Sequence, residues 1–123
     1  MKVTKKVNAR GEYAKLNEDI KDGQTIKILE DCVIVTGEFG DKHVFKVETP
    51  NGEKNLTFNQ TSMNNLIDAF GDETESWVGI EVKAWLITQS IGGQMRRVCY
   101  LTAPEWVMEE DAKGSLVFAP RSL

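Results

Sequence analysis

The feature that most constrains the fold is one change of hydrophobic period in a chain that otherwise alternates. Between residues 24 and 59, apolar and polar residues follow the period of two that is typical of β-strands. The segment "TSMNNLIDAFG" instead has the spacing i, i+3, i+4 and i+7 of one helix face, at Met63, Leu66, Ile67 and Phe70. The period of two then returns between residues 80 and 102. The sequence therefore predicts five strands with a single helix between the third and the fourth.

Turn residues set the expected limits of the first three strands. We expect the first strand to cover residues 24–39, with a bend or bulge near residues 29–31, because charged residues interrupt the alternation there without any helix signal. Gly40-Asp41 closes a hairpin with the second strand. Pro50-Asn51-Gly52 is a strong turn between the second strand and the third. These three strands are therefore expected to form a meander.

The second half of the chain carries its own boundary signals. Gln60 or Thr61 is placed to begin the helix, and Gly71 is placed to end it in a left-handed conformation. The double glycine Gly92-Gly93 separates the last two strands. We therefore divide the chain into an N-terminal arm (1–23), a β domain (24–104) and a partly packed C-terminal tail (105–123).

Composition and motif content exclude several classes of protein. The 123 residues suit one domain, and the apolar runs are too short to span a bilayer. The basic N-terminus lacks the apolar stretch of a secretory signal, so we expect a cytoplasmic protein. Cys32 and Cys99 fit that compartment as buried thiols, with a disulfide left open. A single histidine, His43, and the absence of zinc-binding or catalytic motifs favour a protein that has no metal or cofactor and is not an enzyme.

Charge is distributed unevenly along an acidic chain whose formal net charge is −4. Residues 1–23 hold six Lys/Arg and four Asp/Glu, whereas residues 24–102 hold seven and eleven. Residues 103–123 hold two and four. A partner attracted only by bulk positive charge is therefore disfavoured, but the sequence is compatible with a local basic stripe inside an acidic shell.

Five short strands would leave exposed edges, and closure into a small barrel would remove them. We expect the helix to plug the open end of this barrel with its apolar face. The inward-facing residues expected in the barrel interior are Ile26, Ile28, Val33, Val35, Phe45, Val47, Leu56, Phe58, Val82, Ala84 and Leu86.

This element order resembles that of the OB-fold, an all-β, five-stranded Greek-key barrel with one helix between strands three and four. The resemblance covers about residues 24–102 and rests on topology and turn placement, without a signature motif. The passages "TGEFGDKHVFKV" and "VGIEVKAWLITQSIGGQMRRVCYL" also resemble strand pairs of OB-fold proteins that bind single-stranded nucleic acid. The resemblance implies a ligand across strands two and three, held by the loops at about residues 37–41 and 89–93.

The candidate nucleic-acid-binding residues lie on these strands and loops. They are Phe39, Lys42, Val44, Lys46, Lys54, Thr57, Trp85, Arg96 and Arg97. Cationic side chains would contact phosphates, and aromatic rings would stack on bases. Most also have a structural interpretation: the lysines as ordinary surface residues, Phe39 as a cap on the barrel, and Trp85 as a residue covered by the tail or the N-terminal arm.

The adjacent arginines pose a specific question about orientation. Neighbouring residues on a regular strand point to opposite faces, so we expect only one of Arg96 and Arg97 to face a ligand. The other is expected to be solvated or to pair with an acid such as Glu38 or Glu81. His43 is expected at one end of the barrel, with base stacking as its alternative role.

The leading hypothesis is non-enzymatic binding of single-stranded DNA with weak sequence preference. DNA is preferred to RNA because it is the commoner ligand of a standalone copy of this fold. The alternative is a protein-interaction or oligomerisation module, as a homo-oligomer or in a replication or repair assembly, and the overall acidity favours it. A small-molecule or oligosaccharide binder is a third candidate, since small barrels host those ligands too. None of these functions involves a membrane.

Overall fold

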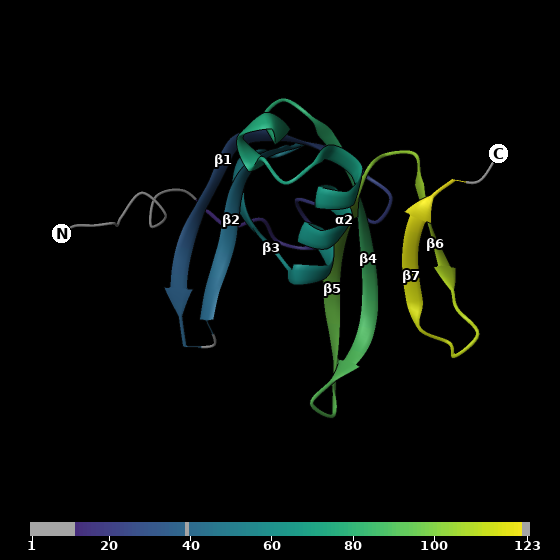
Figure 1. Ribbon diagram of the computed structural model, residues 1–123. Helices are drawn as coiled ribbons and strands as arrows, with labels where there is room; N and C mark the ends of the chain where they lie inside the picture. Colours follow the sequence, from purple (N-terminus) through teal and green to yellow (C-terminus); the bar gives the residue numbers. More distant parts are fainter. Residues whose placement is uncertain (1–11, 39, 122–123) are drawn as a thin grey trace.

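An antiparallel five-stranded sheet with the order β3-β2-β1-β4-β5 organises the computed structural model, which describes residues 12–38 and 40–121 (Figure 1). Its strands are β1 (Thr25–Gly37), β2 (Gly40–Thr49), β3 (Gly52–Phe58), β4 (Glu81–Ile91) and β5 (Gln94–Thr102). The helix α2 (Gln60–Phe70) and the short 3-10 helix η1 (Thr74–Trp77) connect β3 to β4. The strands β6 (Trp106–Glu110) and β7 (Leu116–Pro120) form a separate two-stranded sheet. The predicted β-rich class is confirmed, with α2 between the third and fourth strands.

The bend predicted in the first strand is present in β1. Its register with β2 shifts between Ile28 and Glu30, and again between Glu30 and Val33. At this point the other edge of β1 bonds to the segment before β4: the Gly79 N–H donates to the Ile28 carbonyl at 2.7 Å. The Ile28 N–H in turn donates to the Ile80 carbonyl at 3.0 Å. The irregularity therefore lies where β1 passes from two strand neighbours to one.

This irregularity makes two of the predicted interior positions wrong. Val33 pairs with Val44 on the face opposite the core and is 37% exposed. Val35 is only half-buried and lies outside the core cluster. A register shift moves the following residues of a strand to the other face, and simple alternation cannot anticipate it.

The remaining predicted interior residues do form the core. These are Ile26, Ile28, Phe45, Val47, Leu56, Phe58, Val82, Ala84 and Leu86. The ring of Phe45 stacks on Phe58 at a centroid distance of 4.0 Å and on Trp77 at 5.7 Å. Trp77 is fully buried and donates its indole N–H to the Gly71 carbonyl at 3.0 Å. The segment that follows the helix therefore closes one end of the core.

The helix α2 begins and ends close to the predicted positions. The Asn59 side chain caps it by accepting a bond from the Ser62 N–H at 2.9 Å. Gly71 follows the last helical residue with a φ of 92°, and its N–H donates to the Ile67 carbonyl at 2.8 Å. A side chain at that position would be strained, which explains why glycine stands there.

The two outer strands of the sheet, β3 and β5, are not hydrogen-bonded to each other in the described residues. A closed barrel is therefore not confirmed. Instead α2 lies along β5 and bonds its free edge: the Leu101 N–H donates to the Ser62 hydroxyl at 2.9 Å. The Asn65 amide donates to the Leu101 carbonyl at 3.1 Å, and the Asn59 amide donates to the Cys99 carbonyl at 3.0 Å.

The segment before β1 occupies the free edge of β3. The Asn55 N–H donates to the Glu12 carbonyl, and the Ala14 N–H donates to the Asn55 carbonyl, both at 2.8 Å. Further along this segment, Ile20 is fully buried in the core. Within the predicted N-terminal arm (1–23), residues 12–14 thus form a short edge element, while residues 1–11 lie outside the described part.

The C-terminal tail folds into the β6–β7 hairpin, which stands beside β4 and β5 (Figure 1). The Phe118 ring approaches Tyr100 at a centroid distance of 5.4 Å and Trp85 at 5.9 Å. Trp106 is 6% exposed. The tail therefore covers the outer face of β4 and β5. Among the described residues, no helix has the length and apolar character to cross a membrane.

Candidate nucleic-acid interface

A groove of about 420 Å³ lies between β3, β5 and the segment before β1. Thr57 lines it from β3, and Tyr13 lines it from the N-terminal side. Ile91, Arg96, Arg97 and Val98 line it from the β4–β5 hairpin. The Tyr13 side chain is 46% exposed. The groove thus combines two cations with an accessible aromatic ring and short apolar side chains, and none of its described lining residues is an Asp or a Glu.

Both arginines line this one groove, although the register pairs Arg96 with Gln89 and Arg97 with Thr88 and so sets the two on opposite faces of β5. The reason is that the groove runs along the free edge of β5 rather than over one face of the strand. Side chains that leave a strand toward opposite faces both flank its edge. Strand alternation alone could therefore not predict that both side chains line the same groove.

Neutral amides hold both guanidinium groups in place. Arg96 donates from Nη2 to Oε1 of Gln94 at 3.0 Å, and Arg97 donates from Nη1 to Oδ1 of Asn17 at 3.3 Å. The predicted pairing with Glu38 or Glu81 is not found, since the described residues contain one ion pair and it involves neither arginine. Within the described part of the chain, neither positive charge therefore has a contacting carboxylate.

The β2–β3 face next to this groove carries four of the predicted residues. Lys42, Val44 and Lys46 alternate along β2, and the register places Val44 opposite Thr57. Lys42 and Thr57 are exposed, and Lys46 is half-buried. Val44 shares this face but is only 4% exposed, so it is not available for a ligand in the way the sequence suggested.

Lys54 lies on the other face of the sheet from Lys46 and Thr57. The register places it opposite Val47, whose side chain belongs to the core. Its side chain is 13% exposed, and Nζ lies 3.1 Å from Oε1 of Glu12. The expectation that Lys54 shares one face of the sheet with Lys46 and Thr57 is therefore wrong, because the alternation of β3 places it with Leu56.

The two aromatic candidates have different outcomes. Trp85 is half-buried beneath Phe118 and donates its indole N–H to the Thr102 hydroxyl at 2.9 Å. The Lys83 ammonium lies 4.3 Å from the centre of the same ring system. Coverage by the tail, one of the two interpretations of Trp85, is what the structure shows. Phe39 lies outside the described residues.

The cysteines are both free and half-buried. Burial raises the pKa of Cys99 to about 12, so the thiol beside the groove is neutral at physiological pH and a poor nucleophile. Burial, helped by the nearby Asp31 carboxylate, also raises the pKa of Cys32. No group of three potential metal ligands occurs within residues 12–38 and 40–121.

Sequence reasoning missed the contribution of the N-terminal segment to the groove. Tyr13 and Asn17 come from a stretch without periodicity, so no local pattern marked them. Comparisons with protein-family models, curated proteins and solved structures give no match. The functional interpretation therefore depends on the geometry and charge of the groove itself.

Proposed function

We propose that this chain is a non-enzymatic protein that binds single-stranded DNA, with weak sequence preference, in the groove between β3 and β5. The observation that carries the proposal is that Arg96 and Arg97 line one groove and, among the described residues, bond only to neutral amides. Uncompensated guanidinium groups attract phosphates and also stack on bases. Tyr13 adds an exposed ring on which a base can stack.

The scaffold that fits this function is an OB-fold. The antiparallel order β3-β2-β1-β4-β5 and the helix between β3 and β4 support it. In this arrangement α2 and the segment before β1 bridge the two free edges, where a closed barrel would have a strand ladder. The ligand would pass from the groove onto the β2–β3 face, where Lys42 and Lys46 extend the positive stripe.

The acidity of the chain shapes the expected binding. The net charge of −4 gives no general attraction for nucleic acid, so affinity must come from the local stripe and from stacking. A few phosphate contacts produce a moderate dependence on salt, and sequence-tolerant stacking gives weak base preference.

Fluorescence anisotropy of a labelled oligo-dT, titrated with the full chain at low and at high salt, tests the proposal. We expect saturable binding at low salt that weakens as salt rises, because counterions are released from the phosphates. Absence of binding at low salt would exclude the proposal. A matched duplex of the same sequence serves as the comparison and should bind less tightly.

A second candidate, a protein-interaction or oligomerisation module, is favoured by a different observation. Exposed apolar side chains gather near the ends of the two long hairpins: Ile34 is 53% exposed, Ile91 is 48% exposed and Met95 is 68% exposed. Such surface is typical of contacts with another protein. Sedimentation analysis over a range of concentrations tests self-association, and Met95→Ser should reduce it without changing oligo-dT binding.

A further inference from the structure

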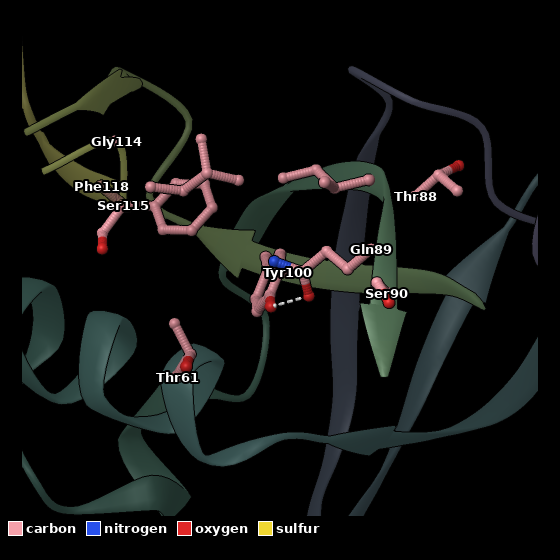
Figure 2. A pocket seen from close by; sticks show the side chains of 10 residues that line it. Thr61, Thr88, Gln89, Ser90, Tyr100, Gly114, Ser115 and Phe118 are labelled. Atoms are coloured by element: carbon pink, nitrogen blue, oxygen red, sulfur yellow. Dashed lines mark hydrogen bonds between the residues drawn. The ribbon is translucent and has the colours of Figure 1, made fainter. Parts of the chain in front are cut away.

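A second groove, of about 550 Å³, lies on the other side of β5, between the outer face of the β4–β5 hairpin and the β6–β7 hairpin. Figure 2 shows its side chains arranged around the Tyr100–Gln89 hydrogen bond. Thr61 reaches it from the start of α2, and Ser115 reaches it from the tail. No sequence motif pointed to this groove, because the tail that walls it is distant in the chain.

Two aromatic rings form an apolar part of the groove wall. The Phe118 and Tyr100 rings lie 5.4 Å apart between centroids and are tilted by 47°. Both residues are half-buried, so parts of both side chains remain accessible to solvent. Such rings suit the face of a planar ligand, since aromatic stacking does not require a particular substituent pattern.

Polar groups with unused hydrogen-bonding capacity face the same space. The Tyr100 hydroxyl donates to Oε1 of Gln89 at 2.6 Å, which fixes the amide and leaves its NH₂ group as a donor. The hydroxyls of Thr61 and Ser115 also line the groove and have no protein partner among the described residues. The groove therefore offers several donors and acceptors around an aromatic wall.

None of the described residues that line this groove carries a charged side chain. An ionised ligand group would have no counter-charge there, so the lining favours a neutral, polar and planar ligand. The wall formed by the tail is a defined turn: the Asp111 carboxylate accepts bonds from the Lys113 and Ser115 N–H groups, both at 2.9 Å. That turn positions Ser115 at the groove.

The register of the β4–β5 hairpin connects this groove to the arginine groove. Gln89 is the cross-strand partner of Arg96, so a hydrogen-bonding amide and a guanidinium group stand side by side. A nucleotide has the same combination, with a charged phosphate next to a neutral planar base. We propose that the groove walled by the β6–β7 hairpin binds one unstacked nucleobase of a strand whose phosphates lie at Arg96, an inference that rests on the proposed function.

The first test uses uncharged deoxynucleosides, which carry a base without phosphate. In heteronuclear NMR titrations of the full chain with thymidine and deoxycytidine, we expect shifts at the Gln89 side-chain amide and at the backbone amides of Ser90 and Ser115. Gln89→Leu should weaken this binding by about fivefold, the value of one lost hydrogen bond. Gln60→Leu, at a glutamine outside the groove, is the matched control and should leave it unchanged.

Methyl glucoside is the competing neutral polar ligand in the same titration. Equal shifts with the sugar, or no shifts at these amides with either deoxynucleoside, would overturn the base-binding role. Both outcomes are read on wild-type protein, so they do not depend on how a variant folds.

The second test changes the ligand instead of the protein. One abasic site is placed at each position in turn of the shortest oligonucleotide that retains full affinity. We expect one position at which base loss weakens binding by about tenfold, within the range for one stacked base, and a smaller loss there in Gln89→Leu. Equal effects at all positions would contradict a dedicated base pocket.

The failures of the two proposals are distinguishable. If deoxynucleosides shift the Gln89, Ser90 and Ser115 signals but no oligonucleotide binds, the base pocket stands and the strand-binding function is wrong. If oligonucleotides bind in a salt-dependent way but deoxynucleosides leave these signals unmoved, the arginine groove stands and the base pocket is wrong.

Discussion

The two grooves that flank β5 differ in how the strand lines them. The arginine groove runs along the free edge of β5, and consecutive residues, Arg96 and Arg97, both line it. The hairpin-walled groove lies over the outer face, where Tyr100 comes from β5 and Gln89 from the opposing strand. One groove is cationic, and the other is neutral. A strand edge can thus collect the charges of adjacent residues.

The largest expected effect is a loss of oligonucleotide binding when the positive charges of the arginine groove are removed. Arg96→Ala/Arg97→Ala should weaken oligo-dT binding more than tenfold at low salt and reduce the salt slope by about 0.7 for each lost phosphate contact. Anisotropy titrations at several salt concentrations measure both quantities. Lys21→Ala/Lys27→Ala, which removes the same charge from two exposed lysines, is the control. An unchanged slope in the arginine variant would mean that neither arginine contacts phosphate.

Next in size is a loss of stability, which tests whether α2 holds β5 in place. Both grooves depend on the position of β5. Ser62→Ala removes the hydroxyl that accepts the buried Leu101 N–H, and a buried donor left unsatisfied costs about 1–3 kcal/mol. Urea unfolding followed by circular dichroism measures the change in the free energy of unfolding. Ser76→Ala, whose exposed hydroxyl bonds only to the Glu73 carbonyl, should cost much less. Equal costs for both variants would contradict the role of α2 on the strand edge.

A smaller effect on tryptophan fluorescence and stability is expected at the groove walled by the β6–β7 hairpin. Phe118→Ala removes the ring that covers Trp85, so the tryptophan fluorescence should shift to longer wavelength and stability should fall by about 1 kcal/mol, less than for a fully buried phenylalanine. Val117→Ala, at an exposed neighbour on the same strand, is the control. A variant that keeps the wild-type emission spectrum would show that the hairpin does not depend on this contact.

The smallest expected effect is a change in thermal stability that depends on pH. It concerns the segment beside the arginine groove. The pKa of Asp19 lies below its ordinary value of 3.8 because its carboxylate accepts two hydrogen bonds. The bond from the Lys15 N–H has the larger influence, and the bond from the Asn51 side-chain amide comes second. A lowered pKa stabilises the fold above pH 3.8, and this contribution is lost as the pH falls through the folded-state pKa. Asp19→Asn should therefore lower the melting temperature at pH 7, with the difference from wild type shrinking toward pH 2.

Thermal unfolding between pH 2 and pH 7 measures this dependence. Asp68→Asn, at an exposed carboxylate of α2, is the control for loss of a negative charge. A difference that stays constant with pH would assign the effect of Asp19→Asn to side-chain shape rather than to charge.

Much of the fold could be predicted because period-two segments and their turns are local signals. The register shift after Ile28 was foreseen as an irregularity, but its consequence for Val33 and Val35 was not, since it depends on how β2 pairs. The sequence also did not indicate that helix side chains bond the free edge of β5. The polar residues Ser62 and Asn65 fall outside the apolar pattern of the helix, and their bonds to the strand join residues more than 35 positions apart.

The candidate site was predictable only in part. Arg96 and Arg97 stood out because they follow a glycine turn in an acidic chain, and both line the groove. Lys54 was misplaced although the alternation of its strand already grouped it with Leu56. Tyr13 left no signal, because its place depends on a backbone bridge to Asn55 that no local pattern encodes. The apolar run of the tail at residues 116–119 could have suggested a strand, but not what it covers.

The occupied edges of the sheet have a consequence for solubility. Unpaired strand edges act as templates for the strands of other chains and lead to aggregation. Here helix side chains bond one edge and residues 12–14 bond the other. Loss of either cover, by mutation of Ser62 or by proteolysis before β1, would therefore expose backbone groups that recruit further copies. The same contacts that hold the groove in shape thus also cover strand edges that would otherwise be open to pairing with further copies.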